Sequence, residues 1–348
     1  MTEIHVIVPE GIDDPTRPSG GNTYDRRVCD GLAALGWAVH EHEVPDAPAL
    51  ARAVERIPDG AVVLLDGLIA SPAPEALVPE ARRLRQVVLM HMPVGHADER
   101  EVLTAATAVV TTSEWSRRRL GELYGLPAAR VHVAEPGVDP AGLAPGTAAG
   151  DALLCVGAVT PAKGHDVLID ALATVADLSW RCACVGSLDR APAFADRVRR
   201  RAWEDALRDR VGFSGPRTGP DLDRAYAAAD VLVLPSQAET YGMVVTEALA
   251  RGLPVIAAEV GGVTEALGHG EHGTRPGLLV PPGDPAALGG ALRAWLEDAE
   301  LRVRLRRAAG ERRATLRPWA ATASAVAGVL AGVVGGAEGV AGVAGAAR

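Results

Sequence analysis

The sequence predicts an α/β protein built from two doubly wound, Rossmann-like domains. The chain has 348 residues, which suits two domains better than one. Short aliphatic and β-branched runs alternate with stretches of helical periodicity, a pattern typical of parallel sheets covered by helices. A segment rich in Pro, Gly and Ala at residues 140–150 indicates a linker between the halves.

The first half is expected to hold six strands. The first strand ends at Pro9, and a polar loop with the adjacent glycines Gly20 and Gly21 leads to a helix expected from about Tyr24 to Leu35. Glycines in such a loop let the backbone approach a phosphate, although a plain glycine loop is an equal alternative. The strands of this half are expected at residues 4–8, 38–44, 61–65, 87–90, 108–112 and 131–134.

The second half repeats the alternation. Its helices are expected to continue to about Arg313, and a last helix to begin at Trp319. Its strands are expected at residues 152–156, 181–185, 211–213, 231–234, 255–258 and 278–280. We therefore expect domains at residues 1–148 and 149–316, a helix at 317–334 that crosses back to the first domain, and a low-complexity, poorly ordered tail at 335–348.

The composition excludes some classes of function. Hydrophobic residues make up 48% of the chain but aromatic residues only 3%, so the cores must be aliphatic. A net charge of −9 argues against nucleic acid and against a membrane as partners. The four cysteines lie in apolar elements without metal-ligand spacing, which favours a reducing, cytoplasmic location.

Two carboxylates stand out in residues 230–262. Glu239 lies in the loop after a strand, and Glu247 follows eight residues later inside a helix that Gly242 opens. The first turn of that helix offers free N–H groups and the positive end of the helix dipole, which suit an anionic ligand. The alternatives are a capping box formed by Ser236 and Glu239, and a solvated Glu247.

This stretch resembles the E-x7-E signature of retaining GT-B glycosyltransferases of the family-four type. The likeness includes the spacing, the glycine after the loop and the Gly-Leu-Pro-Val-Ile strand that follows the helix. It implies two Rossmann-like domains facing a cleft, with Glu239 on the donor sugar and Glu247 on the ribose. It also implies that the donor contacts the segment Thr240, Tyr241, Gly242, Met243 and Val244.

A second stretch, at residues 156–172, resembles the diphosphate clamp V-G-R-L-x-x-x-K-G of the same family. Lys163 and Gly164 match this pattern, but Ala158 stands where the family commonly has Arg. Lys163 is also the only lysine in the chain, and a compact ammonium is well suited to contact phosphate. The strand ends at Gly186 and at Pro216-Arg217 are expected to contact the base.

Candidates in the first half follow from strand ends, where ligands of parallel sheets bind. His91 and Asp66 fall at such ends, and Asn22 follows the glycine pair. A lone His is often structural, and Asp66 could simply cap a helix. The resemblance implies that His91 touches the donor sugar and the reaction centre, with His91, Asn22 and Asp66 as candidates on the acceptor side.

No metal or cofactor is expected. The D-x-D pair of the chain, Asp221 and Asp223, lies at a helix start where capping explains it. We therefore expect metal-independent transfer of a hexose-type sugar, with retention, from a nucleotide sugar to a small soluble acceptor. A UDP-sugar is favoured and a GDP-sugar is the second choice, with His91, Lys163 and Glu239 as catalytic residues. The alternatives are a nucleotide-sugar isomerase or hydrolase of the same fold, and a non-catalytic nucleotide-sugar-binding protein.

Overall fold

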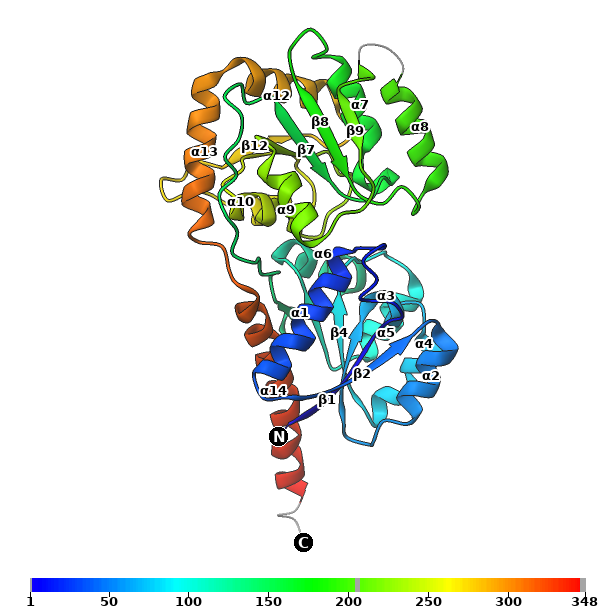
Figure 1. Cartoon of the computed structure of the whole chain (residues 1–348). Helices are drawn as coiled ribbons and strands as arrows, with labels where there is room; N and C mark the ends of the chain where they lie inside the picture. Colours follow the sequence, from blue (N-terminus) through cyan, green and yellow to red (C-terminus); the bar gives the residue numbers. More distant parts are fainter. Residues whose placement is uncertain (1, 204–206, 345–348) are drawn as a thin grey trace. The chain divides into compact units, whose positions relative to one another are not determined.

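The computed structural model describes residues 2–203 and 207–344, with only the backbone described for residues 336–344 (Figure 1). The chain divides into two compact units. The N-terminal unit contains Met1–Asp13, Ser19–Gly137 and Arg317–Arg348, and the C-terminal unit contains Asp14–Pro18 and Val138–Leu316.

The division differs from the boundary expected after residue 148, because residues 138–148 belong to the C-terminal unit. A buried carboxylate explains how the end of this segment is held there. The backbone N–H and the hydroxyl of Thr147 donate to the two oxygens of Asp230 at 2.7 and 2.6 Å, and Asp230 is fully buried.

The N-terminal unit is a six-stranded parallel sheet in the order β2-β1-β3-β4-β5-β6. Every strand expected in this half is present. The strands are β1 (Glu3–Pro9), β2 (Ala38–Val44), β3 (Val62–Asp66), β4 (Arg85–Met90), β5 (Ala108–Thr111) and β6 (Val131–Val133). The helical elements are α1 (Gly20–Ala34), α2 (Ala47–Glu55), α3 (Gly67–Ala70), α4 (Pro74–Leu77), η1 (Pro79–Arg82), α5 (Ala97–Ala105), α6 (Glu114–Tyr124) and η2 (Ala128–Arg130).

Helix α1 begins four residues before the expected start at Tyr24. Ser19 is its N-cap, and its hydroxyl accepts from the backbone N–H of Asn22 at 3.5 Å. Gly20 and Gly21 are therefore first-turn helix residues and not loop residues, so the expected glycine loop was wrong. The capping serine outweighs the low helix propensity of the two glycines.

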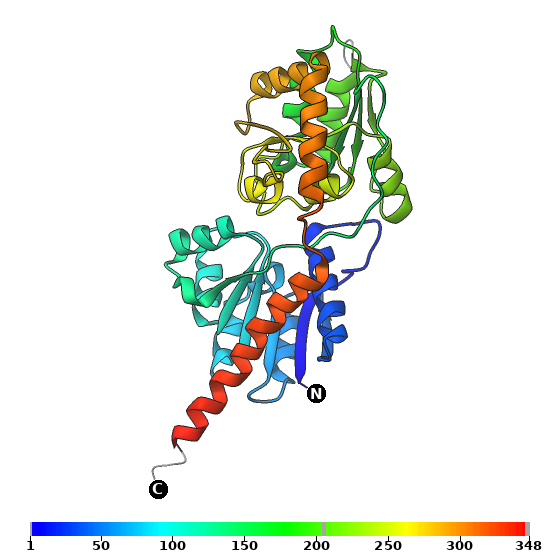
Figure 2. The same cartoon turned by 90° about the vertical axis from the view of Figure 1, so that its left-hand side faces the viewer.

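The last helix, α14 (Trp319–Ala344), packs along α1 and against the sheet of the same unit (Figure 2). Val326 and Leu330 are fully buried there, in one apolar cluster with Ile4 and Val6 of β1. Helix α14 extends to Ala344, so the expected end of the last helix at residue 334 was wrong. Residues 345–348 of the expected tail lie outside the described residues.

The C-terminal unit is also a six-stranded parallel sheet, in the order β12-β11-β10-β7-β8-β9. Its strands are β7 (Ala152–Val156), β8 (Arg181–Val185), β9 (Val211–Phe213), β10 (Val231–Leu234), β11 (Val255–Ala258) and β12 (Gly277–Val280). Its helical elements are η3 (Pro161–Lys163), α7 (His165–Ala173), α8 (Pro192–Trp203), α9 (Gly219–Ala227), α10 (Met243–Ala250), α11 (Val263–Leu267), α12 (Pro285–Glu297) and α13 (Ala299–Arg313).

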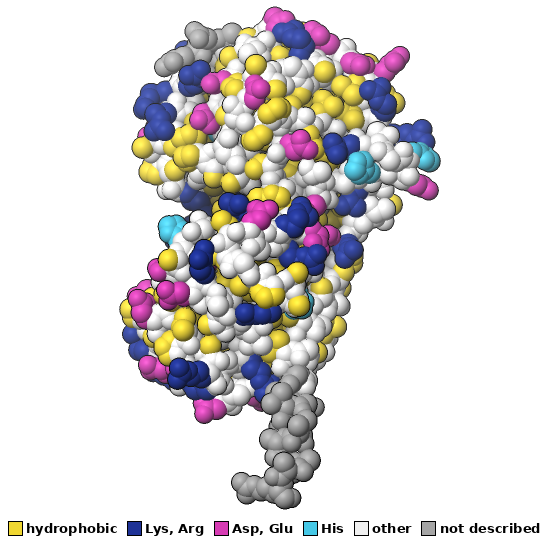
Figure 3. Space-filling model, turned by 180° about the vertical axis from the view of Figure 1, so that it is seen from behind, with side chains coloured by type: hydrophobic (Ala, Val, Ile, Leu, Met, Phe, Trp, Pro, Cys, Tyr) yellow, Lys and Arg dark blue, Asp and Glu magenta, His cyan; other side chains and the backbone are white. Residues whose placement is uncertain are grey.

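The cores are mostly aliphatic, as the composition predicted, and the four cysteines are buried and unpaired. On the face of each unit seen in Figure 3, Lys and Arg side chains are interspersed with Asp and Glu. Within the described part of the chain, no helix combines the length and the apolarity needed to cross a membrane.

Candidate functional site

A lysine–glutamate pair lies at the carboxyl ends of the strands in the C-terminal unit. Lys163 follows β7 and Glu239 follows β10, and Lys163 Nζ lies 2.5 Å from Glu239 Oε1. The hydroxyl of Ser236 donates to the same oxygen at 2.9 Å. The Glu239 side chain is 9% exposed and that of Lys163 31%, so the carboxylate is largely buried while the lysine side chain is partly open to solvent.

Glycines allow the backbone to close around this pair. A Cβ on Gly261 would lie 1.5 Å from the carbonyl oxygen of Glu239, and one on Gly262 would lie 2.3 Å from that of Thr240. Gly164 has φ +65°, and a Cβ there would meet the carbonyl oxygen of Pro235 at 2.2 Å. The approach at Gly164 holds the Lys163 segment against the start of the loop that carries Glu239, and those at Gly261 and Gly262 hold that loop against the residues before α11.

Three strand-end loops meet beside Lys163. The backbone N–H of Gly157 donates to the carbonyl oxygen of Val185 at 2.8 Å, and that of Gly186 donates to the carbonyl oxygen of Gly215 at 3.0 Å. A Cβ on Gly186 would overlap the carbonyl oxygen of Gly157, so only glycine fits this approach. The aliphatic part of the Lys163 side chain lies 3.6 Å from where a Cβ of Gly157 would be. The adjacent Ala158 offers no cation, as the sequence showed.

Helix α10 starts directly after the Glu239 loop. Gly242 is its N-cap, in the left-handed region at φ +93°, without a side-chain cap hydrogen bond. The capping-box alternative is therefore wrong, because Ser236 bonds the Glu239 side chain in a loop and not a helix start. The half-buried Met243 and Val244 form the first turn, whose N–H groups have no acceptor further back in the helix. Tyr241 is buried.

Glu247 is not a solvated helix residue. It is half-buried, and the hydroxyl of Tyr226 on α9 donates to its Oε2 at 2.7 Å. Burial raises the pKa of Glu247, against the lowering effect of the Tyr226 hydrogen bond and of Arg251. The guanidinium of Arg251 lies 4.5 Å from the centre of the Tyr226 ring, so Tyr226 and Arg251 together surround this carboxylate.

The remaining candidates of this unit, Pro216 and Arg217, are at least partly exposed. Pro216 is half-buried and Arg217 is exposed, both in the loop after β9. The D-x-D pair makes ion pairs with arginines, Asp221 with Arg224 and Asp223 with Arg251. Neither Asp caps α9 through a hydrogen bond, so the expected side-chain capping was wrong.

In the N-terminal unit, His91 lies between two buried aspartates. Its Nε2 is 2.7 Å from Asp25 Oδ1 and 3.4 Å from Asp66 Oδ2. Asp25 comes from α1 and Asp66 from the end of β3, whereas His91 directly follows β4. Asp66 also caps α3, accepting from the N–H groups of Leu68 and Ile69 at 2.6 and 3.2 Å, so the expected capping role is confirmed.

The charges of this cluster are coupled. Burial opposes a charge on His91, but the attraction and hydrogen bonds of Asp25 and Asp66 outweigh it and raise the pKa of His91. Burial raises the pKa of Asp25, and the imidazole of His91 opposes that rise. Oδ2 of Asp25 is buried without a hydrogen-bond partner. His91 is therefore best described as an imidazolium held by a buried carboxylate.

The glycines of α1 lie beside this cluster. A Cβ on Gly21 would lie 3.4 Å from His91 Cδ2, so the structure brings these two predicted residues together. The ring of Tyr24 meets the His91 ring edge-on at 5.3 Å. Asn22 instead donates from its side-chain amide to the carbonyl oxygen of Ile12 at 3.2 Å, a structural role.

The sequence analysis missed Asp25 and Tyr226. The signal for Asp25 was its place on the buried stripe of α1, since Val28, Cys29 and Leu32 follow it at helical spacing. A carboxylate among apolar residues on one helix face needs a partner. Asp25, Asp66 and His91 also bring their ligand atoms within 4.8 Å of one another, close enough to share a cation.

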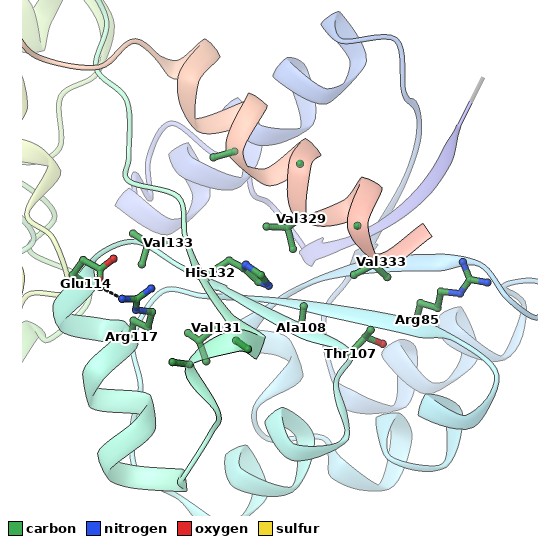
Figure 4. Close-up of a pocket in the computed structure, with 15 residues that line it drawn as sticks. Arg85, Thr107, Ala108, Glu114, Arg117, Val131, His132, Val133, Val329 and Val333 are labelled. Atoms are coloured by element: carbon green, nitrogen blue, oxygen red, sulfur yellow. Dashed lines mark ion pairs between the residues drawn. The ribbon is translucent and has the colours of Figure 1, made fainter. Parts of the chain in front are cut away.

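An open pocket of about 930 Å³ lies elsewhere in the N-terminal unit (Figure 4). It lies between α14 and the strands β5 and β6, and none of the candidate residues named above lines it. Val329 and Val333 of α14 face Val131, His132 and Val133 across it (Figure 4).

A family model matches most of the C-terminal unit. Residues 150–312 match the family model of glycosyl transferases group 1. The matched segment contains Lys163, Glu239 and Glu247, the strand-end loops around them, and all six strands of the second sheet.

Two curated relatives are similar to 62% and 67% of this chain. The chain is 34% identical over 238 residues to a D-inositol 3-phosphate glycosyltransferase of Jonesia denitrificans, over 62% of this chain and 54% of that protein. It is 37% identical over 261 residues to the protein of the same name from Kineococcus radiotolerans, over 67% of this chain and 59% of that protein. The chain thus spans little more than half the length of these relatives.

Solved structures show that the two-domain α/β fold is that of GT-B glycosyltransferases. Sucrose-phosphate synthase from Thermosynechococcus elongatus has a TM-score of 0.78 at 22% identity, over 97% of this chain and 100% of that one. Anabaena HepE in complex with UDP-glucose has a TM-score of 0.76 at 19% identity, over 95% of this chain and 100% of that one. At these identities the likeness concerns the fold.

Proposed function

We propose that this chain is a retaining glycosyltransferase that moves a hexose-type sugar from a nucleotide sugar to a small acceptor without a metal. A UDP-sugar is the favoured donor and a GDP-sugar the second choice. The names of the curated relatives and the UDP-glucose bound to a protein of the same fold support this proposal. Its location is proposed to be the cytoplasm, in keeping with four free, buried cysteines.

The observation that carries the proposal is the contact of Lys163 with Glu239 at the strand ends. Glycosyl transfer places new negative charge on the leaving diphosphate, and that charge must be stabilised. The ammonium of Lys163 and the first-turn N–H groups of α10 are donors of the required kind. One such preorganised donor contributes ~3 kcal/mol to lowering the barrier.

Glu239 and Glu247 are assigned to hydroxyl groups of the donor. Glu239 keeps one oxygen on Lys163 and Ser236, which leaves Oε2 to accept from the sugar. Glu247 is held by Tyr226 through one oxygen, which leaves the other to accept from the ribose diol. In each case a fixed carboxylate loses little conformational entropy when it binds.

His91 is assigned to the reacting sugar or the acceptor as a cationic hydrogen-bond donor. Its Nε2 faces the aspartates, and its ring packs beside Gly21 at the start of α1. The free N–H groups of that helix start suit an anionic acceptor. The names of the curated relatives make an inositol phosphate the first acceptor to test.

Metal independence is part of the proposal and has a direct test. The Asp25, Asp66 and His91 cluster has the donor set for a cation, but its His91 nitrogen is engaged by Asp25 at 2.7 Å. We expect turnover to survive dialysis against a chelator. A loss that added Mg²⁺ or Mn²⁺ restores would overturn this part of the proposal.

The function itself is tested with a panel of nucleotide sugars. A true donor binds the native state and raises Tm, and at a concentration of about 100 Kd the gain is about 2.7 kcal/mol. Product analysis with and without inositol phosphate then separates the classes. A new glycoside with retained anomeric configuration supports transfer, whereas free sugar or an isomerised nucleotide sugar without acceptor supports the hydrolase or isomerase alternative. Binding with no product supports the non-catalytic alternative, which Ala158 keeps open.

A further inference from the structure

Three histidines lie on one face of the N-terminal sheet. His5 is on β1, and His40 and His42 are on the neighbouring edge strand β2. The register pairs His5 with His40, and alternate residues of a strand point to the same face. His5 is the third residue of its strand, so this cluster is not at the carboxyl ends where Asp66 and His91 lie.

The imidazoles of this cluster are in contact. Nδ1 of His5 lies 3.0 Å from Nε2 of His42. The ring of His5 also stacks on the rings of His40 and His42, with centroids 5.1 and 5.3 Å apart. Imidazole nitrogens bind Zn²⁺ at about 2.0–2.1 Å, which places neighbouring tetrahedral ligands roughly 3.3 Å apart. Two nitrogens from different strands are therefore already close to ligand spacing.

Two further groups can complete a coordination shell. His40 is exposed and its ring already stacks on that of His5, so the proposed site requires its side chain to change rotamer and turn a ring nitrogen toward the other two. Glu3 is exposed and lies two residues before His5 on the same face of β1, and its carboxylate acts electrostatically on His5.

We propose that His5, His40 and His42 form a binding site for a divalent transition metal. Imidazole ligands favour Zn²⁺, Ni²⁺ and Cu²⁺ over Mg²⁺ or Ca²⁺. Glu3 or a water supplies the fourth ligand. A two-residue spacing on one strand with a third His opposite on the next is a rigid arrangement, because the sheet fixes all three Cβ positions.

The protonation states agree with this geometry. Burial and the neighbouring imidazoles lower the pKa of His5, and burial and His40 lower that of His42. Both shifts favour the neutral imidazole, which is the form that keeps the lone pair a metal requires. Without a metal, the same 3.0 Å contact is a hydrogen bond between two neutral imidazoles.

The test uses the full chain without a polyhistidine tag, stripped by a chelator and dialysed. Zn²⁺ is titrated calorimetrically, and Co²⁺ is titrated with its visible absorption as a report of ligand geometry. The wild-type chain is expected to bind one equivalent in this cluster, His42→Gln to lose it, and His40→Gln to bind at least tenfold more weakly. His96→Gln is the matched control, because His96 is exposed in the same unit and outside the cluster.

The variant Asp25→Asn distinguishes metal binding at the three histidines from binding at the Asp25, Asp66 and His91 cluster. Binding that survives in Asp25→Asn and is lost in His42→Gln supports the proposal. Binding that is unchanged in His42→Gln and His40→Gln, or is absent from the wild-type chain, overturns it. Circular dichroism without metal checks the fold of each variant, and the exposed His40 gives a second variant if His42→Gln fails to fold. None of these outcomes depends on glycosyl transfer.

Discussion

Asp25 holds His91 inside the N-terminal unit through a contact of 2.7 Å between Oδ1 and Nε2. Asp25 is 1% exposed, and a buried carboxylate without a partner is strongly destabilising. The pair therefore fixes both the orientation and the charge of the imidazole. In the proposed function His91 would therefore serve as a cationic donor and not as a general base, since its raised pKa favours the protonated form at neutral pH.

Replacing Asp25 with Asn should remove the carboxylate that stabilises the positive charge of the His91 imidazole. The pKa of His91 is expected to fall toward its ordinary value of about 6.5, and turnover to fall about tenfold or more at pH 8. An NMR pH titration of the His91 ring and a pH–rate profile measure the two effects. Asp30→Asn is the control, since Asp30 is exposed on the same helix. An unchanged His91 titration would show that Asp25 does not set its charge.

The same pair predicts how stability depends on pH. The attraction of Asp25 and Asp66, which outweighs burial, raises the pKa of His91 to about 10. Because the pKa of His91 is higher in the folded than in the unfolded chain, protonated His91 stabilises the folded protein. This contribution is fully present below about pH 6.5, the ordinary pKa of His in the unfolded chain, and it is lost as the pH rises through about 10. Urea unfolding of the wild-type chain should therefore show stability falling between pH 7 and pH 10 more steeply than in Asp25→Asn. Parallel curves for the two chains would contradict the assignment.

Lys163→Ala should reduce turnover by about 10²–10³-fold, because it removes one preorganised donor to the leaving diphosphate. Glu239 keeps its hydrogen bond from Ser236, so Tm should change little. Steady-state kinetics with the identified donor measure the effect. Lys163→Arg is the informative companion, since a planar guanidinium does not replace a compact ammonium. A near-normal kcat in Lys163→Ala would remove this residue from the mechanism.

Glu247→Ala should weaken nucleotide binding about tenfold or more, which matches the loss of a hydrogen bond to a charged group. Calorimetry with the nucleotide diphosphate measures the affinity. Glu247→Gln is the matched control, because it keeps an acceptor for the Tyr226 hydroxyl and so separates folding from binding. An equal affinity of the Ala variant and the wild-type chain would rule out the ribose role.

Gly261→Ala should destabilise the C-terminal unit by about 3 kcal/mol or more, since an added Cβ would overlap the Glu239 carbonyl oxygen. Gly219→Ala is the control. It has a similar φ of +52° but no atom within 4 Å of an added Cβ, so backbone strain alone costs about 1–2 kcal/mol. Denaturant unfolding compares the two variants. Equal losses in the free energy of unfolding of the two variants would mean that the backbone moves to accommodate the Cβ at residue 261 beside the Glu239 carbonyl oxygen at no cost.

Much of the fold could be predicted because apolar runs and strand spacing are local signals. All twelve strands occur where the apolar runs predicted them. The start of α1 was missed because a serine hydroxyl and not apolar periodicity decides where the helix begins. The placement of residues 138–148 was missed because it depends on Asp230, which is distant in the sequence.

The residues of the candidate site were predictable where their type is rare in the chain or where several residues of a motif lie close together in the sequence. Lys163 and Glu239 were named from the sequence, and the structure joins them. The relation between Asp25 and His91 was not predictable from spacing, since 66 residues separate them and the strand order alone brings them together. Tyr226 was missed for the same reason, because its role is set by the packing of α9 on α10.

Helix α14 gives the protein an unusual order of assembly. The N-terminal unit buries Val326 and Leu330 in its own core, yet these residues are made only after the whole C-terminal unit has been synthesised. A fragment ending at residue 137 would leave that apolar surface open to water or to chaperones. The chain cannot be cut once to give two self-sufficient pieces, and a synthetic peptide corresponding to residues 317–335 should rescue the solubility of the N-terminal fragment.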